Sequence, residues 1–291
     1  MKKLAALFLS ALMAAGCLLP AFAEEDQPFY LLLGDSIAEG YGIENSDEAC
    51  YGRIVADTNG YHYANYARTA TDSSELLDRI SEGGFYDVFY GVRNAIAGAD
   101  IISLSIGSND YFDNDDVYRL AVGAFFMING KELDAIAENF YGNLCAIIGE
   151  IRGLNPDATI LVQNVYCVWY GIAAHIYKAC SNRVNAMIER YDREHPGDIC
   201  ICDISPAMNG HPERLADDCV HPNAAGNVAI AEIVLRQLNE LGLGTQTIPV
   251  VNQPGIDYNF FEEFYENKAL ARLLTFLVKV LTGNAITIPA A

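Results

Sequence analysis

The sequence predicts an α/β fold in which a parallel sheet of five strands lies between two layers of helices. Five short apolar or β-branched runs recur along the chain, and helical patterns separate them. Three of the runs (LLL, IISLSI and TILVQ) are almost continuously apolar, as strands are when helices cover both faces of their sheet. This alternation is typical of a three-layer αβα sandwich, whose reactive groups gather beyond the carboxyl ends of the strands.

The expected strands and helices follow from these runs and from the signals between them. The strands are Phe29–Leu33, Tyr61–Asn65, Ile101–Ile106, Thr159–Asn164 and Ile199–Ile204. One helix begins at Asp72-Ser73-Ser74-Glu75, which has the form of a capping box. Three longer helices are expected over about Glu132–Arg152, Tyr177–Arg193 and Pro222–Leu241. We expect Pro222 in the first turn of the last helix, where proline is favoured.

The amino-terminal end has the pattern of a signal peptide over residues 1–23. Lys2 and Lys3 precede an apolar run, Leu4–Leu19, and the small-x-small motif Ala21-Phe22-Ala23 follows, with acidic residues directly after it. We therefore expect cleavage near Ala23 and a secreted, extracellular protein. A retained membrane anchor is disfavoured because the run is short. Lipid attachment at Cys17 ranks below simple secretion because a small residue stands three positions before it.

The charge of the chain argues against nucleic acid as a partner. The formal net charge is −20, and such an acidic protein repels polyanions at long range. Hydrophobic residues make up 52% of the chain, which is enough for a core and excludes a disordered protein. The sequence does not set the oligomeric state.

The cysteines that would remain after cleavage are odd in number and too sparse for the fold to depend on disulfides. No C-x-x-C pair occurs, and Cys200 and Cys202 are expected on one face of a strand. Buried thiols are the favoured interpretation, and one or two disulfides of unknown pairing are the alternative. The seven cysteines are Cys50, Cys145, Cys167, Cys180, Cys200, Cys202 and Cys219.

The carboxyl-terminal tail, residues 245–291, differs from the domain expected over residues 24–244. Thr245–Gly255 is a turn-rich connector, and an amphipathic helix follows it. This helix is too short to span a bilayer. It is expected to pack on the domain, and contact with a membrane surface is the alternative. The apolar residues at helical spacing are Leu270, Leu273, Leu274, Leu277 and Leu281.

Two polar segments follow expected strands. Ser36, after Gly34-Asp35, is well placed to project a hydroxyl nucleophile, although the same residues are common in turns. Asn109 follows the third strand in Gly107-Ser108-Asn109-Asp110, and its amide could donate to an oxyanion or simply form a turn.

A histidine near the end of the domain has the right neighbour to act as a base. A hydroxyl nucleophile needs a base to take its proton, and the base needs an acceptor to hold its tautomer. Asp218 lies three residues before His221 on one tight loop and could be that acceptor. Of the other histidines, His62 lies in an expected strand and His211, in a loop, has no acid three residues before it. His175 and His195 fall in helical stretches.

The order of these motifs resembles that of the SGNH or GDSL hydrolases over roughly Phe29–Leu241. Gly-Asp-Ser matches the first block of that family, Gly-Ser-Asn-Asp the third and Asp-x-x-His-Pro the last. The resemblance implies a flavodoxin-like three-layer αβα sandwich. It also implies that Ser36 is the nucleophile, His221 the general base and Asp218 the orienting acid. The Ser36 backbone N–H and Asn109 would be oxyanion donors.

The second block departs from the family pattern. The family places a glycine, whose N–H is a further oxyanion donor, five residues after an asparagine, and here Ala70 stands five residues after Asn65. Ala70 keeps the N–H, but a positive φ at this position would bring strain of order 1 kcal/mol.

The resemblance implies hydrolysis of a carboxylic ester through an acyl-enzyme on Ser36, with no metal or organic cofactor. Nothing in the sequence selects among lipid, acyl and acetylated-carbohydrate esters. The segment from Tyr111 to Gly130 could line an acyl pocket, but a helical insertion is favoured. The rivals are a non-catalytic carbohydrate- or lipid-binding protein of the same fold and a surface interaction protein that works through its tail helix.

Overall fold

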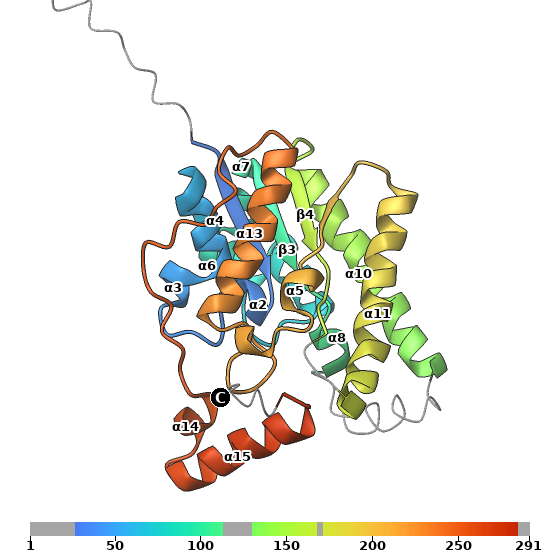
Figure 1. Ribbon diagram of the computed structural model, residues 1–291. Coiled ribbons are helices and arrows are strands. Elements are labelled where there is room, and N and C mark those ends of the chain that lie inside the picture. Colours follow the sequence, from blue (N-terminus) through green and yellow to red (C-terminus); the bar gives the residue numbers. More distant parts are fainter. Residues whose placement is uncertain (1–26, 113–129, 168–170, 285–291) are drawn as a thin grey trace, which may run out of the picture.

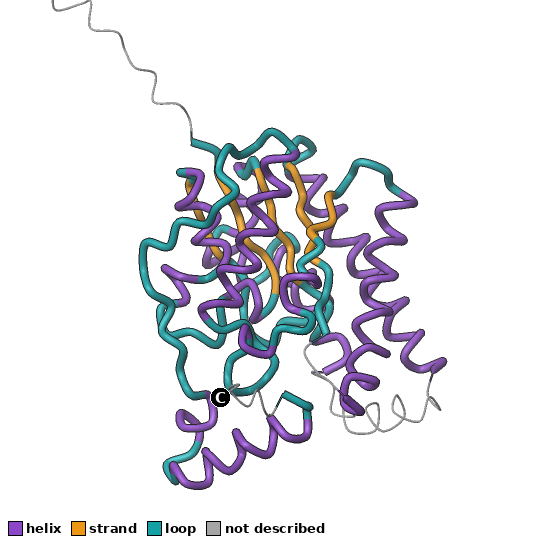
Figure 2. The backbone as a smooth tube through the Cα atoms, viewed as in Figure 1, coloured by secondary structure: helices purple, strands orange, loops and turns teal. Residues whose placement is uncertain are grey.

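Five parallel strands form the central sheet in the order β2-β1-β3-β4-β5 (Figures 1 and 2). The computed structural model describes residues 27–112, 130–167 and 171–284. The strands are β1 Phe29–Gly34, β2 His62–Asn65, β3 Ile101–Ser105, β4 Thr159–Gln163 and β5 Cys200–Cys202. The chain order reverses at β1, which lies between β2 and β3. Such a reversal opens a crevice beyond the carboxyl ends of the strands, and Ser36 and Asn109 follow β1 and β3 there.

Alternate side chains of the strands enter two separate cores. Leu31 and Leu33 of β1 belong to one core, whereas Tyr30 and Leu32 belong to the other, because successive side chains of a strand point to opposite faces. On the Leu31 face pack α5 Ser73–Ile80, α7 Val92–Gly98, α10 Gly130–Leu154 and α11 Gly171–Glu194. On the Leu32 face pack α4 Tyr51–Asn59 and α13 Ala224–Glu240. The predicted three-layer αβα sandwich is confirmed.

Short helices occupy the loops between these elements. They are α2 Ser36–Glu39, α3 Ser46–Ala49, α6 Phe85–Tyr90, α8 Asn109–Phe112, α12 Ser205–Met208 and the 3₁₀ turn Pro212–Arg214.

The helix starts show which of the expected caps form. Asp72 caps α5 as predicted, since its Oδ1 accepts a hydrogen bond from the Glu75 N–H at 2.8 Å. The expectation for Pro222 is wrong. Asn223 is the N-cap of α13 and accepts from the Gly226 N–H at 3.0 Å, so Pro222 precedes the helix. An asparagine side chain satisfies a free N–H of the first turn, which lets the helix begin after it.

Several expected features lie outside the described residues or differ in detail. The signal peptide with Cys17 and most of the segment between Tyr111 and Gly130 lie outside the described residues. β5 is shorter than Ile199–Ile204, and His195 follows the last residue of α11. None of the seven cysteines in the described residues forms a disulfide bond, and five of them are buried. In the described ranges, no helix has both the length and the hydropathy needed to cross a membrane.

The carboxyl-terminal segment crosses the outside of the sandwich before it forms two helices. The Thr245 and Gln246 N–H groups donate to Asn59 Oδ1, and the Val250 N–H donates to Thr58 Oγ1 at 2.9 Å. The chain then enters α14 Phe260–Phe264 and α15 Lys268–Leu281. These two helices lie at the end of the molecule where α2 and α8 are found (Figure 1).

Candidate active site

The turn after β1 places the Ser36 hydroxyl at the first residue of α2, where the side chain is largely buried. Gly34 has a φ of 138°, and a Cβ there would lie 1.9 Å from the Ser105 carbonyl oxygen, so only glycine fits. Asp35 then caps α2, since its Oδ1 accepts from the Ile37 N–H at 3.0 Å. As the first helical residue, Ser36 has a backbone N–H that points away from the helix ladder.

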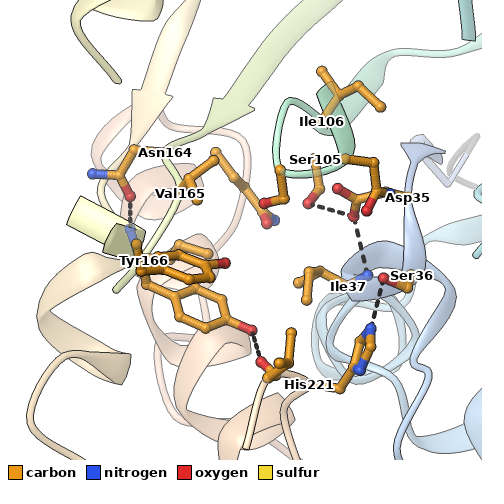
Figure 3. A pocket seen from close by; sticks show the side chains of 15 residues that line it. Asp35, Ser36, Ile37, Ser105, Ile106, Asn164, Val165, Tyr166 and His221 are labelled. Carbon is orange, nitrogen blue, oxygen red and sulfur yellow. Dashed lines mark hydrogen bonds between the residues drawn. The ribbon is translucent and has the colours of Figure 1, made fainter. Parts of the chain in front are cut away.

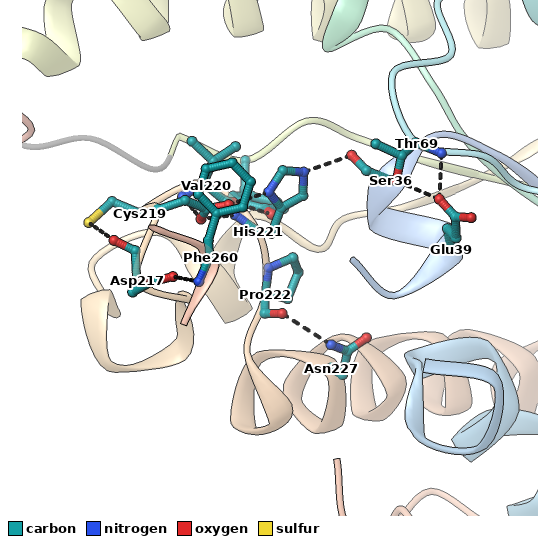
Figure 4. Close-up of polar contacts among 12 residues, drawn as sticks. Ser36, Glu39, Thr69, Asp217, Cys219, Val220, His221, Pro222, Asn227 and Phe260 are labelled. Atoms are coloured by element: carbon teal, nitrogen blue, oxygen red, sulfur yellow. Dashed lines mark hydrogen bonds and ion pairs between the residues drawn. The ribbon is translucent and has the colours of Figure 1, made fainter. Parts of the chain in front are cut away.

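The loop before α13 joins an acid, a base and the serine hydroxyl in one chain of hydrogen bonds, of which Figure 4 shows the bond between His221 and Ser36. Asp218 Oδ2 lies 2.6 Å from His221 Nδ1, and His221 Nε2 lies 2.9 Å from Ser36 Oγ. Asp218 Oδ1 also accepts from the Val220 and His221 N–H groups. Because a carboxylate only accepts, Nδ1 carries the proton and Nε2 is free to accept from Ser36.

The environment of Asp218 keeps its carboxyl group ionised. Burial alone would raise the pKa of Asp218, but the hydrogen bond and charge of His221 and the loop N–H groups outweigh burial, so the pKa is lowered. The carboxylate can therefore stabilise an imidazolium on His221.

Asp35, next to the serine, has the opposite character. Burial raises its pKa to about 7, and the hydrogen bonds from the Ile37 N–H and the Ser105 hydroxyl only partly oppose this shift. The motif Gly34-Asp35-Ser36 is visible in the sequence, but the burial of this carboxyl group is not.

The expected oxyanion donors lie on three different loops. Asn109 is the first residue of α8, and one N–H of its amide donates to the Thr71 carbonyl oxygen at 2.9 Å. Ala70 has a φ of 63°, so the left-handed conformation that would strain an alanine is present. Ser36 and Asn109 line the same cavity, whereas Ala70 does not line it.

Two side chains whose contacts the sequence analysis did not predict, Asn65 and Glu39, hold the Ala70 loop. Asn65 Nδ2 donates to the Ala38 carbonyl oxygen, and Asn65 Oδ1 accepts from the Ala67 N–H, both at 2.9 Å. Glu39 of α2 accepts from both the N–H and the hydroxyl of Thr69 (Figure 4). The loop that carries Ala70 is thus tied to the helix that carries Ser36.

Asp110, beside Asn109, fixes α8 to α5. Its carboxyl group accepts from the Ser73 N–H at 3.1 Å and from the Ser73 hydroxyl, which in turn accepts from Asn143 Nδ2 at 2.8 Å. Burial raises the pKa of Asp110 to about 6.

A cavity of about 190 Å³ opens beside Ser36, and most of the surface of its wall is apolar, although polar side chains such as Asp35, Ser105 and Asn164 also line it (Figure 3). Tyr166 closes part of it, and its hydroxyl donates to the Val220 carbonyl oxygen at 2.9 Å, which ties the loop after β4 to the loop of His221. The apolar lining residues include Ile37, Ile106, Val165, Tyr177 and Ile204.

An aromatic cluster covers the other side of the histidine ring. The ring of Tyr41 meets that of His221 edge-on at 4.6 Å between centroids, and Tyr258 and Phe260 pack on Tyr41. Tyr258 and Phe260 come from the carboxyl-terminal segment, so this segment supports the site. No sequence motif indicates this contact, because the residues lie more than 200 positions apart along the chain.

The other histidines do not join the site. His62 lies on β2, His175 lies on α11, and His211 Nδ1 lies 2.8 Å from Glu213 Oε1. Across the described ranges, no group of three or more histidine, cysteine or acidic side chains could hold a metal ion.

A comparison with models of protein families identifies one family. A model described as the GDSL-like lipase/acylhydrolase family matches residues 32–229. A search of curated proteins found no match. Among solved structures, a lipase from a goat rumen metagenome has a TM-score of 0.58 and 17% identity, and the match covers 75% of this chain and 99% of that one.

Two further structures show the same fold. Phospholipase A1 from Streptomyces albidoflavus NA297 has a TM-score of 0.53 and 19% identity, with 74% of this chain and 99% of that chain covered. An acetylxylan esterase from Geobacillus stearothermophilus has a TM-score of 0.53 and 16% identity, with 77% and 97% covered. Two structures of this esterase are of catalytic mutants, in which a serine and a histidine, respectively, are replaced by alanine.

Proposed function

Because this chain belongs to the GDSL-like lipase/acylhydrolase family, whose members act on ester bonds, we propose that it hydrolyses carboxylic esters by acyl transfer through Ser36. The observation that carries the proposal is the continuous pair of hydrogen bonds from Asp218 through His221 to Ser36 Oγ, at 2.6 and 2.9 Å. A non-catalytic binding protein would have no need of a hydroxyl joined to a base in this way.

The geometry supports a two-step mechanism. In the first step Ser36 Oγ attacks the ester carbonyl carbon while His221 Nε2 takes its proton, and the carbonyl oxygen becomes an oxyanion. The C–O bond to the alcohol then breaks, and His221 returns the proton to the leaving oxygen. In the second step a water molecule attacks the acyl-Ser36 ester with His221 again as base, which releases the acid and restores the serine.

Three donors are proposed for the oxyanion: the Ser36 N–H, the Ala70 N–H and the Asn109 amide. Asn109 uses one of its two amide N–H groups on Thr71, and the other remains for the substrate oxygen. The same bond holds Asn109 to the residue that follows Ala70, so the two donors are positioned together.

The cavity beside Ser36 is proposed to hold the acyl group. Its wall is mainly apolar, and apolar side chains bind hydrocarbon without leaving polar groups unpaired (Figure 3). Lipid, simple acyl and acetylated-carbohydrate esters all present an acyl group of this kind.

Secretion is proposed on the sequence of residues 1–23 alone. The basic head, the apolar run and the Ala21-Phe22-Ala23 motif support cleavage near Ala23. Mass spectrometry of protein recovered from the medium of an expressing bacterium would test this, and a mature chain that begins at Lys2 would contradict it.

The proposed nucleophile can be tested by labelling and by turnover. Wild-type protein should react with a fluorophosphonate probe at Ser36 and hydrolyse p-nitrophenyl esters, whereas Ser36→Ala should do neither. Ser74→Ala is the matched control, because Ser74 is exposed on α5, and it should keep full activity. Full ester turnover by Ser36→Ala would refute the proposal. A series of acyl chain lengths, run beside acetylated xylan, would then identify the ester class.

A further inference from the structure

The terminal helix α15, Lys268–Leu281, turns its most apolar face away from the protein. At 3.6 residues per turn, Ala271, Leu274 and Val278 fall on the side that packs inward, and of the three only Ala271 is fully buried. The opposite side carries only apolar residues, and each of its large side chains is between 41% and 73% exposed. These side chains are Leu270, Leu273, Phe276, Leu277, Val280 and Leu281. The helix therefore presents an uncovered apolar face, and the predicted leucine pattern does not serve mainly to pack on the domain.

All the charges of α15 are positive and lie together along one edge of this face. Lys268, Arg272 and Lys279 share one side of the helix wheel, and residues 268–281 contain no acid. The charge of this segment is thus opposite in sign to the net charge of −20 of the whole chain. Glu262 of α14 pairs with Lys268 at 4.0 Å and with Arg272 at 3.4 Å. Both cations nevertheless remain more than 70% exposed, so their charged ends can reach other groups.

The helix is attached to the loop that carries the catalytic base. The Phe260 N–H at the start of α14 donates to Asp217 Oδ1 at 2.9 Å (Figure 4). At the other end of the pair of helices, Thr282 is buried and lies beside the Cys219 thiol. Asp217 and Cys219 lie four and two residues before His221. Helix α15 therefore lies at the same end of the molecule as the site (Figure 1).

We propose that α15 docks this protein on a phospholipid surface. The outward apolar face enters the boundary between acyl chains and headgroups, and Lys268, Arg272 and Lys279 lie at the level of the phosphates. A phospholipid surface accounts for both features at once, since it offers hydrocarbon and negative charge at adjacent depths. Docking does not depend on Ser36 as nucleophile, so it can fail or hold independently of the proposed function.

The test measures partition onto vesicles of phosphatidylcholine and phosphatidylglycerol at a 7:3 ratio by sedimentation. The chain from Glu24 onward is used, because it keeps every described residue and lacks the apolar run of residues 4–19, which would itself bind lipid. The double variant Leu273→Ser/Phe276→Ser should lower the partition coefficient about 10-fold or more. The variant Lys268→Ser/Arg272→Ser should lower it several-fold, and added salt should weaken wild-type binding.

Two controls separate docking from unfolding and from self-association. Ile248→Ser removes an apolar side chain that is 78% exposed outside α15 and should bind as wild type does. Leu273→Ser/Phe276→Ser should keep the wild-type circular-dichroism spectrum and the wild-type midpoint of urea unfolding, which shows that the fold is intact whether or not the protein is an esterase. Wild-type partition by this variant would overturn the proposal. So would a wild-type dimer, seen by light scattering, that the double substitution dissociates, because a second copy would then cover the face.

Discussion

The side-chain amide of Asn109 donates a hydrogen bond of 2.9 Å to the carbonyl oxygen of Thr71, which joins the loop after β3 to the loop after β2. Thr71 is fully buried and directly follows Ala70. One bond therefore sets the relative position of two proposed oxyanion donors that lie 39 residues apart in the chain. The predictions for Asn109 and Ala70 depend on this hydrogen bond.

Asn109→Ala should lower kcat by about 100- to 1,000-fold, because it removes a hydrogen bond that becomes stronger as negative charge develops on the substrate oxygen. KM for a p-nitrophenyl ester should change much less. Asn94→Ala, at an exposed position of α7, is the control and should have no effect. If Asn109→Ala keeps the wild-type kcat, its amide serves only to hold the Thr71 loop.

Ala70→Gly should leave the free energy of unfolding nearly unchanged. Relief of the strain at a φ of 63° is worth about 1 kcal/mol, and the added unfolded-state entropy of glycine costs about 0.5–1 kcal/mol. The matched control is Ala97→Gly in the exposed part of α7, which gains no relief and should lose about 0.5–1 kcal/mol. Unfolding by urea measures the free energy of unfolding of both variants. A loss for Ala70→Gly equal to that of the control would show that the alanine is not strained. The kcat of Ala70→Gly should stay close to that of wild type, since alanine and glycine both have the backbone N–H.

His221→Ala should lower kcat/KM at least as much as Asp218→Ala. Without His221 nothing accepts the Ser36 proton, whereas without Asp218 the imidazole still acts as a base in a poorer orientation. Both losses should reach about 10³-fold or more. His211→Ala should behave as wild type, because His211 pairs with Glu213 and not with Ser36. The reverse ranking of His221 and Asp218 would mean that the base is misassigned.

Asp35→Asn should stabilise the protein relative to wild type by an amount that grows as the pH rises. Burial raises the pKa of Asp35 from 3.8 to about 7, so between these values the folded state binds more protons than the unfolded state. The stability of wild type therefore falls as the pH rises through this window. The stability of Asp35→Asn does not fall in this way, because asparagine stays neutral. For a pKa shift of about three units, the difference in the free energy of unfolding between Asp35→Asn and wild type can approach about 4 kcal/mol. Chemical unfolding of both proteins at about pH 4 and pH 8 measures it, and a difference that is constant with pH would contradict the buried carboxyl group.

The sequence by itself determined the strands, the layers and the three residues of the hydrogen-bonded chain. Parallel strands bring their carboxyl ends to one edge, so polar residues after β1 and β3 had to lie near each other. Asp218 and His221 are three positions apart on one loop, and their contact is local. The exact end of a strand or helix was less certain, as Pro222 shows, because a neighbouring side chain such as Asn223 can supply the cap.

Contacts between distant segments were decided only by the tertiary structure. Three such features are the packing of Tyr41 on His221, the burial of Asp35 and the hydrogen bonds that hold the Ala70 loop. Each depends on contacts between segments that are distant in the chain, which no local sequence pattern predicts. The same holds for α15. Periodicity defines the faces of a helix, but which face is covered depends on the surface that the rest of the chain presents. Here that surface covers the side of Ala271 and leaves Leu270, Leu273, Leu277 and Leu281 exposed.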